Sequence, residues 1–391
     1  MTFALRHLEV PAEVIEIAQK LEDAGHEAWC VGGALRDAIL QDAQSDYDLA
    51  TSATPDQVQQ LFRRTVPVGI RFGTVGVLDR ARRMHEVTTF RRDVETDGRH
   101  AVVQYGVSLE DDLARRDFTI NALAYHPLRR EWRDPFDGAA DIDRGVVRAV
   151  GEPATRFRED YLRILRALRF AARFGFRIDE ATWAAALEAA PGLQGLSAER
   201  VRDEWFKGLM STRSVPEMVR LWRESGAAAI WLPELRDATI DVPRAERDAV
   251  LLTVLLTKSP VAVLRRLKTS GTEIARAQAV AVAPAEPRGR DEESVRRWLS
   301  AANAAADDAL TLHRWRTGEP APWAATAEKI RVRGDAVRRE QLAVRGTDLI
   351  EAGIPAGPAL GAVLGRLLER VLVDPALNTR ERLLALAREG T

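Results

Sequence analysis

Apolar and polar positions divide the chain into two parts of different character. Up to residue 150, short apolar or alternating runs typical of β-strands are separated by turn residues. One segment, 11–24, repeats apolar positions at helical spacing between a proline and Gly25, which predicts a helix. Strands are predicted at residues 28–31, 46–50, 74–78, 85–90 and 145–150. The first part is therefore expected to be an α/β domain.

After Gly151 the pattern changes to long stretches rich in alanine, leucine, arginine and glutamate. Apolar residues recur there at helical spacing, and strand formers are few. Helices are predicted at residues 158–174, 179–190, 198–210 and a last one through Val371. Stretches rich in proline and charge, 283–291 and 317–322, are expected to be loops or boundaries. The fold class we expect is an α/β head followed by an elongated all-helical body.

Composition narrows the functional classes without choosing one. The 391 residues include 57 basic and 58 acidic ones, for a formal net charge of -1, which excludes a uniformly basic coat for nucleic acid. Any RNA binding must use local patches. Only five of the 57 basic residues are lysine, which leaves 52 arginines. Arginine suits phosphate and base edges, but codon bias explains such a count equally well.

We expect a soluble cytoplasmic protein. Cys30 is the single cysteine, so no internal disulfide can form, in keeping with a reducing compartment. The N-terminus shows no secretory signal pattern. The longest apolar stretch, at residues 249–256, is far short of the ~20 residues that span a bilayer.

The central chemical signal is a pair of carboxylates, Asp46 and Asp48, with one residue between them. On a strand, such residues point to the same face. Their charges repel unless a cation lies between them, and oxygen ligands of this kind suit Mg²⁺. Two such ions, ~3.5–4 Å apart, can activate a hydroxyl and stabilise a leaving pyrophosphate. Glu86, on a later predicted strand, is either a third carboxylate or a solvent-facing residue.

A turn at Gly32 and Gly33 precedes the carboxylate pair and leads into a predicted helix. Backbone N–H groups and the helix dipole at such a start favour phosphate. Arg36 can add positive charge to the same site. Because the turn, the helix and the acidic strand follow one another, their combination indicates a nucleotide site more strongly than any one of them.

Two further clusters combine arginines with polar partners. In the first, residues 115–122, Arg116 can neutralise a triphosphate and Asn121 can bond a sugar hydroxyl. A helix start capped by Asp117 is the alternative interpretation. The second contains seven arginines between residues 156 and 177, among them Arg166 and Arg169.

Within the second cluster, Asp160 and Arg163 are three residues apart and are expected to share a helix face. Cytosine and adenine each present an amino donor beside a ring-nitrogen acceptor. An acid beside an arginine is the complementary pattern, so this pair could select C and A without a template. The alternative is a plain salt bridge between Glu159 and Arg163, four residues apart.

Taken together, these segments resemble bacterial class II tRNA nucleotidyltransferases, the CCA-adding enzymes, and their poly(A) polymerase relatives. The matching stretches are residues 31–37 with 46–48, 86–90, 115–122, 134–138, 158–163, 197–201 and the tail at 346–378. The resemblance implies that Asp46 and Asp48 hold catalytic Mg²⁺, with Glu86 as a candidate third carboxylate. The remaining residues that it assigns to nucleotide binding are Gly32, Gly33, Arg36, Arg116, Asn121, Asp160, Arg163, Arg166 and Arg169.

The resemblance also implies a domain order and partners. It predicts a nucleotidyltransferase head with a mixed sheet at residues 1–150, a base-reading helical neck at 151–210, a helical body at 211–325 and a tRNA-binding tail at 326–391. The substrates implied are tRNA, CTP and ATP, with pyrophosphate released. No hydrolase signature is visible among the six scattered histidines.

The extent of nucleotide addition stays open in the sequence. Relatives that add only CC have a shortened loop after the third-carboxylate strand, and here the corresponding stretch, 91–106, is retained. This favours full CCA addition, although Ala101 stands near a place where relatives often have proline. The alternatives are CC-only, A-only or poly(A) addition, an inactive RNA-binding module, and a transferase acting on a small molecule.

Overall fold

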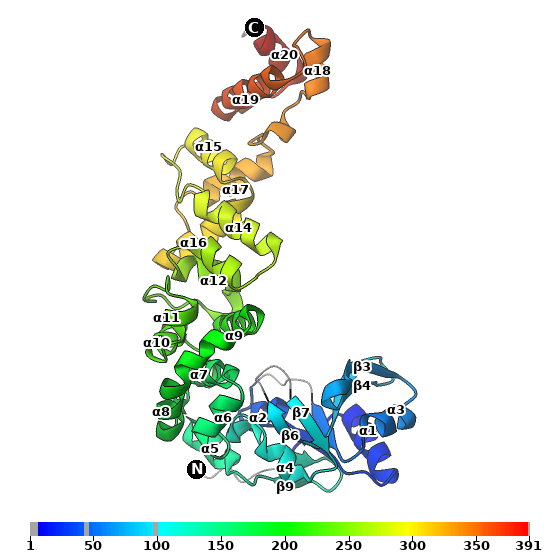
Figure 1. Ribbon diagram of the computed structural model, residues 1–391. Coiled ribbons are helices and arrows are strands. Elements are labelled where there is room, and N and C mark those ends of the chain that lie inside the picture. The colour runs from blue at the N-terminus through cyan, green and yellow to red at the C-terminus, as the bar shows by residue number, and fades with distance from the viewer. Residues whose placement is uncertain (1–6, 43–46, 97–100, 390–391) are drawn as a thin grey trace. The chain divides into compact units, whose positions relative to one another are not determined.

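The computed structural model describes residues 7–42, 47–96 and 101–389 (Figure 1). Its contacts divide the chain into two compact units, Met1–Asp237 and Ala238–Thr391. The finer division into head, neck, body and tail stays a prediction. The first unit holds the strands of the structure and the candidate site residues, so its sheet is described first.

Seven strands of the first unit form one mixed sheet. Their order across the sheet is β3 (Thr65–Gly69), β4 (Thr74–Leu78), β5 (Met84–Thr89), β2 (Asp48–Thr51), β1 (Ala28–Val31), β8 (Ala124–His126) and β9 (Glu131–Arg133). Only β2 and β5 run parallel to each other among these pairs. Two small sheets accompany it: the hairpin of β6 (Arg91–Thr96) and β7 (Ala101–Tyr105), and β10 (Val146–Val147) beside β11 (Arg177–Ile178).

Helices pack around this sheet and extend the first unit. They are α1 (Ala12–Asp23), α2 (Gly33–Ile39), α3 (Pro55–Leu61), α4 (Leu109–Ala114), α5 (Gly138–Arg144), α6 (Pro153–Glu159), α7 (Leu162–Phe174), α8 (Glu180–Ala189), α9 (Ala198–Ser211), α10 (Val215–Glu224) and α11 (Ala227–Trp231). Local chemistry sets several boundaries. Asp179 caps α8 by accepting from Thr182 N, and Gly175 ends α7 with a φ of 68°.

The two faces of the sheet differ in their covering. On one face, Trp29, Val31 and Ala50 join Leu109 and Leu113 of α4 in a buried apolar cluster. Because side chains alternate along a strand, the neighbouring residue Leu49 points to the opposite face. Helix α1 packs against β1, and α3 packs against β4 and β5. The first face is the one that carries Asp48.

Three sequence predictions need correction here. The predicted helix at 158–174 is two helices, because the backbone at Asp160 is extended, with φ -155° and ψ 104°. The predicted strand at 145–150 shortens to Val146–Val147, since Gly145 is left-handed with a φ of 65°. The capped helix considered at residues 115–122 is a turn that contains only the 3-10 element η2 (Thr119–Asn121).

In the second unit, the regular elements of the described residues, 238–389, are helices joined by loops. Its helices are α12 (Ala249–Leu256), α13 (Pro260–Arg266), α14 (Gly271–Val282), α15 (Glu292–Ala302), α16 (Ala306–Thr317), α17 (Ala324–Arg333), α18 (Gly346–Glu351), α19 (Pro358–Val373) and α20 (Arg380–Glu389). The predicted loop at 283–291 lies between α14 and α15, as expected. No helix in the described ranges is long and apolar enough to cross a membrane.

Candidate active site

Asp48 and Glu86 lie side by side on neighbouring strands. Asp48 opens β2, and the parallel register pairs the next residue, Leu49, with Val87 of β5. Asp48 and Glu86 are each one residue before that pair, so both point to the same face of the sheet. Both are partly exposed. Asp46, the other half of the predicted carboxylate pair, lies outside the described residues.

The turn at Gly32 lies close to the Asp48 carboxylate. Gly32 has φ 82° and ψ -143°, a conformation that suits glycine. A Cβ at this position would lie 3.3 Å from Arg116 Nη1 and 3.9 Å from Asp48 Oδ2. Gly33 begins α2 directly afterwards. The glycine therefore lets a carboxylate and a guanidinium gather at a helix start.

Arg116 is held in place by a buried acid. Its Nη2 donates to Asp112 Oδ2 at 3.2 Å, and its Nη1 donates to the Asn121 carbonyl oxygen at 3.4 Å. Asp112 also accepts from Arg115 at 2.8 Å. Burial alone would raise the pKa of Asp112, but the two arginines hold it below its usual value. Arg116 thus presents a fixed positive charge beside the Gly32 turn.

Arg36 and Asn121 are buried, at 3% and 6% exposed. Arg36 donates to Asp37 Oδ1 and to Asn121 Oδ1. Its guanidinium lies 4.9 Å from the Phe170 ring and 4.7 Å from the Phe174 ring. Burial lowers the pKa of Arg36 against the opposing effect of Asp37. Because protein groups engage both side chains, direct contact with a nucleotide would require them to rearrange.

A charged network links the η2 turn to α7 and α9. Asp117 accepts from Arg166 at 2.6 and 2.7 Å and from Asn121 at 2.9 Å. Arg169 donates to Glu204 at 2.6 Å. Burial favours protonation of Asp117, but Arg166, Asn121 and the backbone outweigh it and lower its pKa to about 2. Arg166 and Arg169 therefore bind acids of this unit in the structure.

Asp160 and Arg163 do not share a helix face, because the chain breaks between α6 and α7 at Asp160. Asp160 Oδ1 accepts from Leu162 N at 3.0 Å, and its Oδ2 accepts from Arg200 at 2.6 Å. Arg163 donates to Glu159 at 2.9 Å, which is the salt bridge considered as the alternative. That part of the base-reading expectation, a preformed pair on one helix, is wrong. Arg200 was missed, although it belongs to the matching stretch at 197–201.

The acids present fit a divalent cation only in part. Within the described ranges, no group of three or more histidine, cysteine or acidic side chains gathers as a metal site. Asp48 and Glu86 supply two hard oxygen donors on one face, as Mg²⁺ prefers. A third such donor is expected from Asp46.

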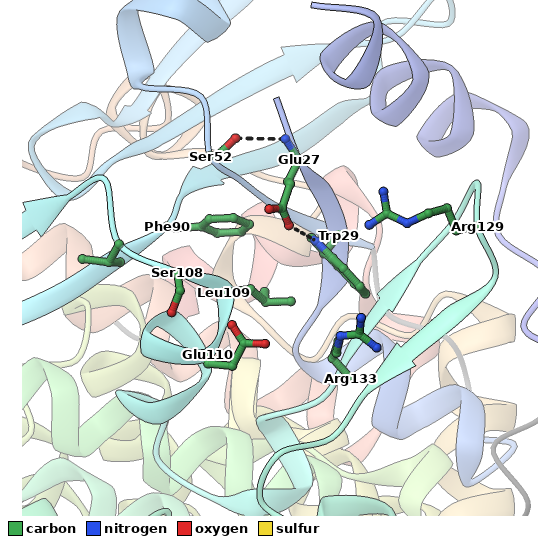
Figure 2. Close-up of a pocket in the computed structure, with 10 residues that line it drawn as sticks. Glu27, Trp29, Ser52, Phe90, Ser108, Leu109, Glu110, Arg129 and Arg133 are labelled. Carbon is green, nitrogen blue, oxygen red and sulfur yellow. Dashed lines mark hydrogen bonds between the residues drawn. The ribbon is translucent and has the colours of Figure 1, made fainter. Parts of the chain in front are cut away.

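A separate pocket of about 390 Å³ lies at the other end of β1 (Figure 2). Trp29 donates to Glu27 at 2.9 Å, and the guanidinium carbons of Arg129 and Arg133 lie 5.3 and 5.6 Å from its ring. Phe90 lies on the opposite wall (Figure 2). The pocket contains none of the site residues predicted from the sequence.

Three family models match the chain in succession. The poly(A) polymerase head domain matches residues 28–148, a probable RNA- and SrmB-binding site of polymerase A matches 175–239, and a tRNA nucleotidyltransferase domain matches 244–387. The mixed sheet, with its glycine turn beside adjacent carboxylates, thus belongs to a nucleotidyltransferase.

Full-length relatives narrow the class. The CCA-adding enzyme of Lactiplantibacillus plantarum is 35% identical over 97% of this chain and 97% of its own length. That of Geobacillus stearothermophilus is 35% identical over 96% of each chain. The crystal structure of the Bacillus stearothermophilus CCA-adding enzyme with CTP has a TM-score of 0.82 at 32% identity, covering 97% of this chain and 96% of that one. The chain belongs to the family of CCA-adding enzymes.

Proposed function

We propose that this enzyme adds C and A to the 3′ end of tRNA from CTP and ATP, without a template, and releases pyrophosphate. One observation carries the proposal: Asp48 and Glu86 lie level on adjacent strands beside the Gly32 turn and Arg116. This arrangement combines carboxylates for metal ions with donors for phosphates. We place the reaction in the cytoplasm, where its tRNA substrate is made.

Asp46 and Asp48 would hold Mg²⁺, with Glu86 as the third carboxylate. The bound metal would supply charge that activates the RNA hydroxyl and stabilises the leaving pyrophosphate. The Gly32–Gly33 backbone N–H groups and Arg116 bind the triphosphate, because both carry positive potential at the turn.

The buried residues serve the same site indirectly. Arg36 and Asn121 hold the α2 start against the η2 turn, and Arg166 and Arg169 fix α7 through Asp117 and Glu204. These are positioning residues, since their polar groups are bound to protein partners. Direct contacts with phosphate or ribose would follow only a change in these bonds.

Base selection is assigned to the region of Asp160 and Arg163. Asp160 can accept the amino group of cytosine or adenine, and Arg163 can donate to the neighbouring ring nitrogen. To contact the base, Arg163 must break its ion pair with Glu159, while Arg200 stays hydrogen-bonded to Asp160. The retained hairpin of β6 and β7 favours addition of all three nucleotides. Residues 97–100 lie outside the described residues.

Three tRNAs test the proposal: one without CCA, one ending in C and one ending in CC. Each is incubated with labelled CTP or ATP, and the products are sized on a gel. CCA addition predicts incorporation of CTP on the first two and one A on the third. Long A tracts would indicate a poly(A) polymerase, and no product with any tRNA would contradict the proposal.

A further inference from the structure

An exposed apolar surface continues the sheet face that carries the candidate acids. Val66, Val68 and Met84 are 37%, 44% and 42% exposed. Val68 and Met84 meet over Gly76, where an added Cβ would lie 2.9 Å from Val68 and 2.8 Å from Met84, and Val66 is the register partner of Gly76. We call these three residues the β3–β5 shelf. An exposed apolar cluster of this kind marks an interaction site more often than isolated residues do.

The strand register places the shelf in line with the acids. Val66 pairs with Gly76, and Gly76 pairs with Glu86, which lies level with Asp48. Paired residues share a face of a sheet, so the row runs from Asp48 across β5 and β4 to Val66. On the other side of Asp48, the same face is covered by α4. The acids thus stand where the covered half of the face ends and the shelf half begins.

The distance along this row suits a short single strand. Neighbouring strands are about 4.8 Å apart, so three intervals place Val66 ~14 Å from Asp48. Stacked nucleotides rise by about 3.4 Å each, so a few of them span the distance from Asp48 to Val66. The end of an RNA whose terminal hydroxyl lies at the acids would therefore reach the shelf.

The surroundings favour RNA over another protein strand. β3 is one of the two edge strands of the sheet (Figure 1) and contains Pro67, whose missing N–H weakens pairing with an added strand. The exposed Arg64 directly precedes β3. Its carbonyl oxygen accepts a hydrogen bond from the N–H of Leu78, so Arg64 lies level with Leu78 of β4. Arg64 is therefore on the shelf face, where it can meet a phosphate.

We propose that the β3–β5 shelf supports the unpaired bases just before the 3′ end of the acceptor RNA, with Arg64 on their backbone. The inference rests on the proposed function, since it takes the reacting hydroxyl to lie at Asp48 and Glu86. The shelf has no hydrogen-bonding side chain, so it holds bases by their apolar faces and accepts any sequence. The growing end can therefore change from the discriminator base to C without loss of support.

Photocrosslinking locates the RNA end directly. A tRNA ending in CC carries 4-thiouridine at the nucleotide just before its two terminal cytidines, and it is irradiated on the full-length enzyme with a non-reacting ATP analogue. Tryptic peptides 65–71 and 84–91 contain the shelf, and we expect the crosslink there. Crosslinks confined to other peptides would overturn the proposal.

Substitution tests whether the contact matters. In the triple variant V66S/V68S/M84S, the single-turnover rate of ATP addition should fall roughly fivefold, while the KM for ATP stays unchanged. The matched control is Met210→Ser, since Met210 of α9 is 39% exposed and lies outside the shelf; it should keep the wild-type rate. A wild-type rate in the triple variant overturns the shelf but leaves the proposed function standing, because the unsubstituted enzyme reports on that function separately. Loss of a dimer in sedimentation, with the rate unchanged, would assign the surface to a second copy instead.

Discussion

Two groups of candidate site residues have opposite surroundings in the first unit. Asp48 and Glu86 are partly exposed on one sheet face, beside Gly32 and Arg116. A mostly buried network of hydrogen bonds and ion pairs binds Arg36, Asn121, Asp117, Arg166, Glu204 and Arg169. The difference separates groups that can touch a substrate from groups that hold them in position. Substitutions in the first group should abolish chemistry, and those in the second should weaken folding.

The largest effect is expected at Asp48. Asp48→Ala should lower incorporation of CTP and ATP by on the order of a thousandfold, because a lost metal ligand removes several kcal/mol of transition-state stabilisation. Binding of tRNA, measured by filter retention, should be unchanged. Asp23→Asn is the control, since this exposed acid at the end of α1 is outside the site. Full activity in Asp48→Ala would remove the catalytic assignment.

The buried network should be tested by stability. Asp117→Asn leaves Arg166 without its closest acid, so we expect the free energy of unfolding to fall by about 3–5 kcal/mol. Glu217→Gln breaks the exposed pair with Arg220 and should cost less than about 1 kcal/mol. Urea unfolding measures both variants. Equal losses would show that burial does not distinguish the two pairs.

The low pKa of Asp117 predicts how the stability of the protein depends on pH. Its folded pKa is about 2 against a usual 3.8, so its contribution to stability is present above the usual value. That contribution, about 2 kcal/mol, is lost as pH falls from near 4 toward 2. Unfolding free energies at several acidic pH values should therefore drop less steeply in Asp117→Asn than in the wild type. Identical slopes would contradict the low pKa.

The smallest effect concerns fidelity. Asp160→Ala should raise incorporation of UTP and GTP relative to CTP and ATP by about tenfold, since it removes one charge-assisted hydrogen bond. Arg200→Ala should act in the same direction, because Arg200 holds the Asp160 carboxylate, and Arg200→Lys should restore part of the selectivity. Nucleotide competition assays measure the ratio. Unchanged selectivity in all three variants would exclude base reading at Asp160.

The sequence predicted the elements that follow simple periodicity and missed those that depend on distant contacts. Residues 28–31 and 74–78 form strands as expected, because apolar runs and β-branched residues end at clear turn signals. Strand β3 was missed because Pro67 interrupts its short run of apolar residues, and a proline within such a run argues against a strand.

The site was predicted in residue types more than in contacts. The glycine turn and Asp48 come together as local spacing suggests. The sequence pattern predicts Arg36 to be a phosphate ligand. In the structure its guanidinium packs against the rings of Phe170 and Phe174, which are distant in sequence. The break at Asp160 interrupts a helical pattern that looks continuous, so the partner Arg200 could not be inferred from periodicity.

Metal binding tests the central claim most directly. Electron paramagnetic resonance counts Mn²⁺ bound to the enzyme in the presence of a non-hydrolysable CTP analogue. The arrangement of acids predicts tight binding of Mn²⁺ by the wild type, weaker binding by Glu86→Gln and no binding by Asp48→Asn. Equal Mn²⁺ binding by the wild type and Asp48→Asn would contradict a reaction centred on this sheet face.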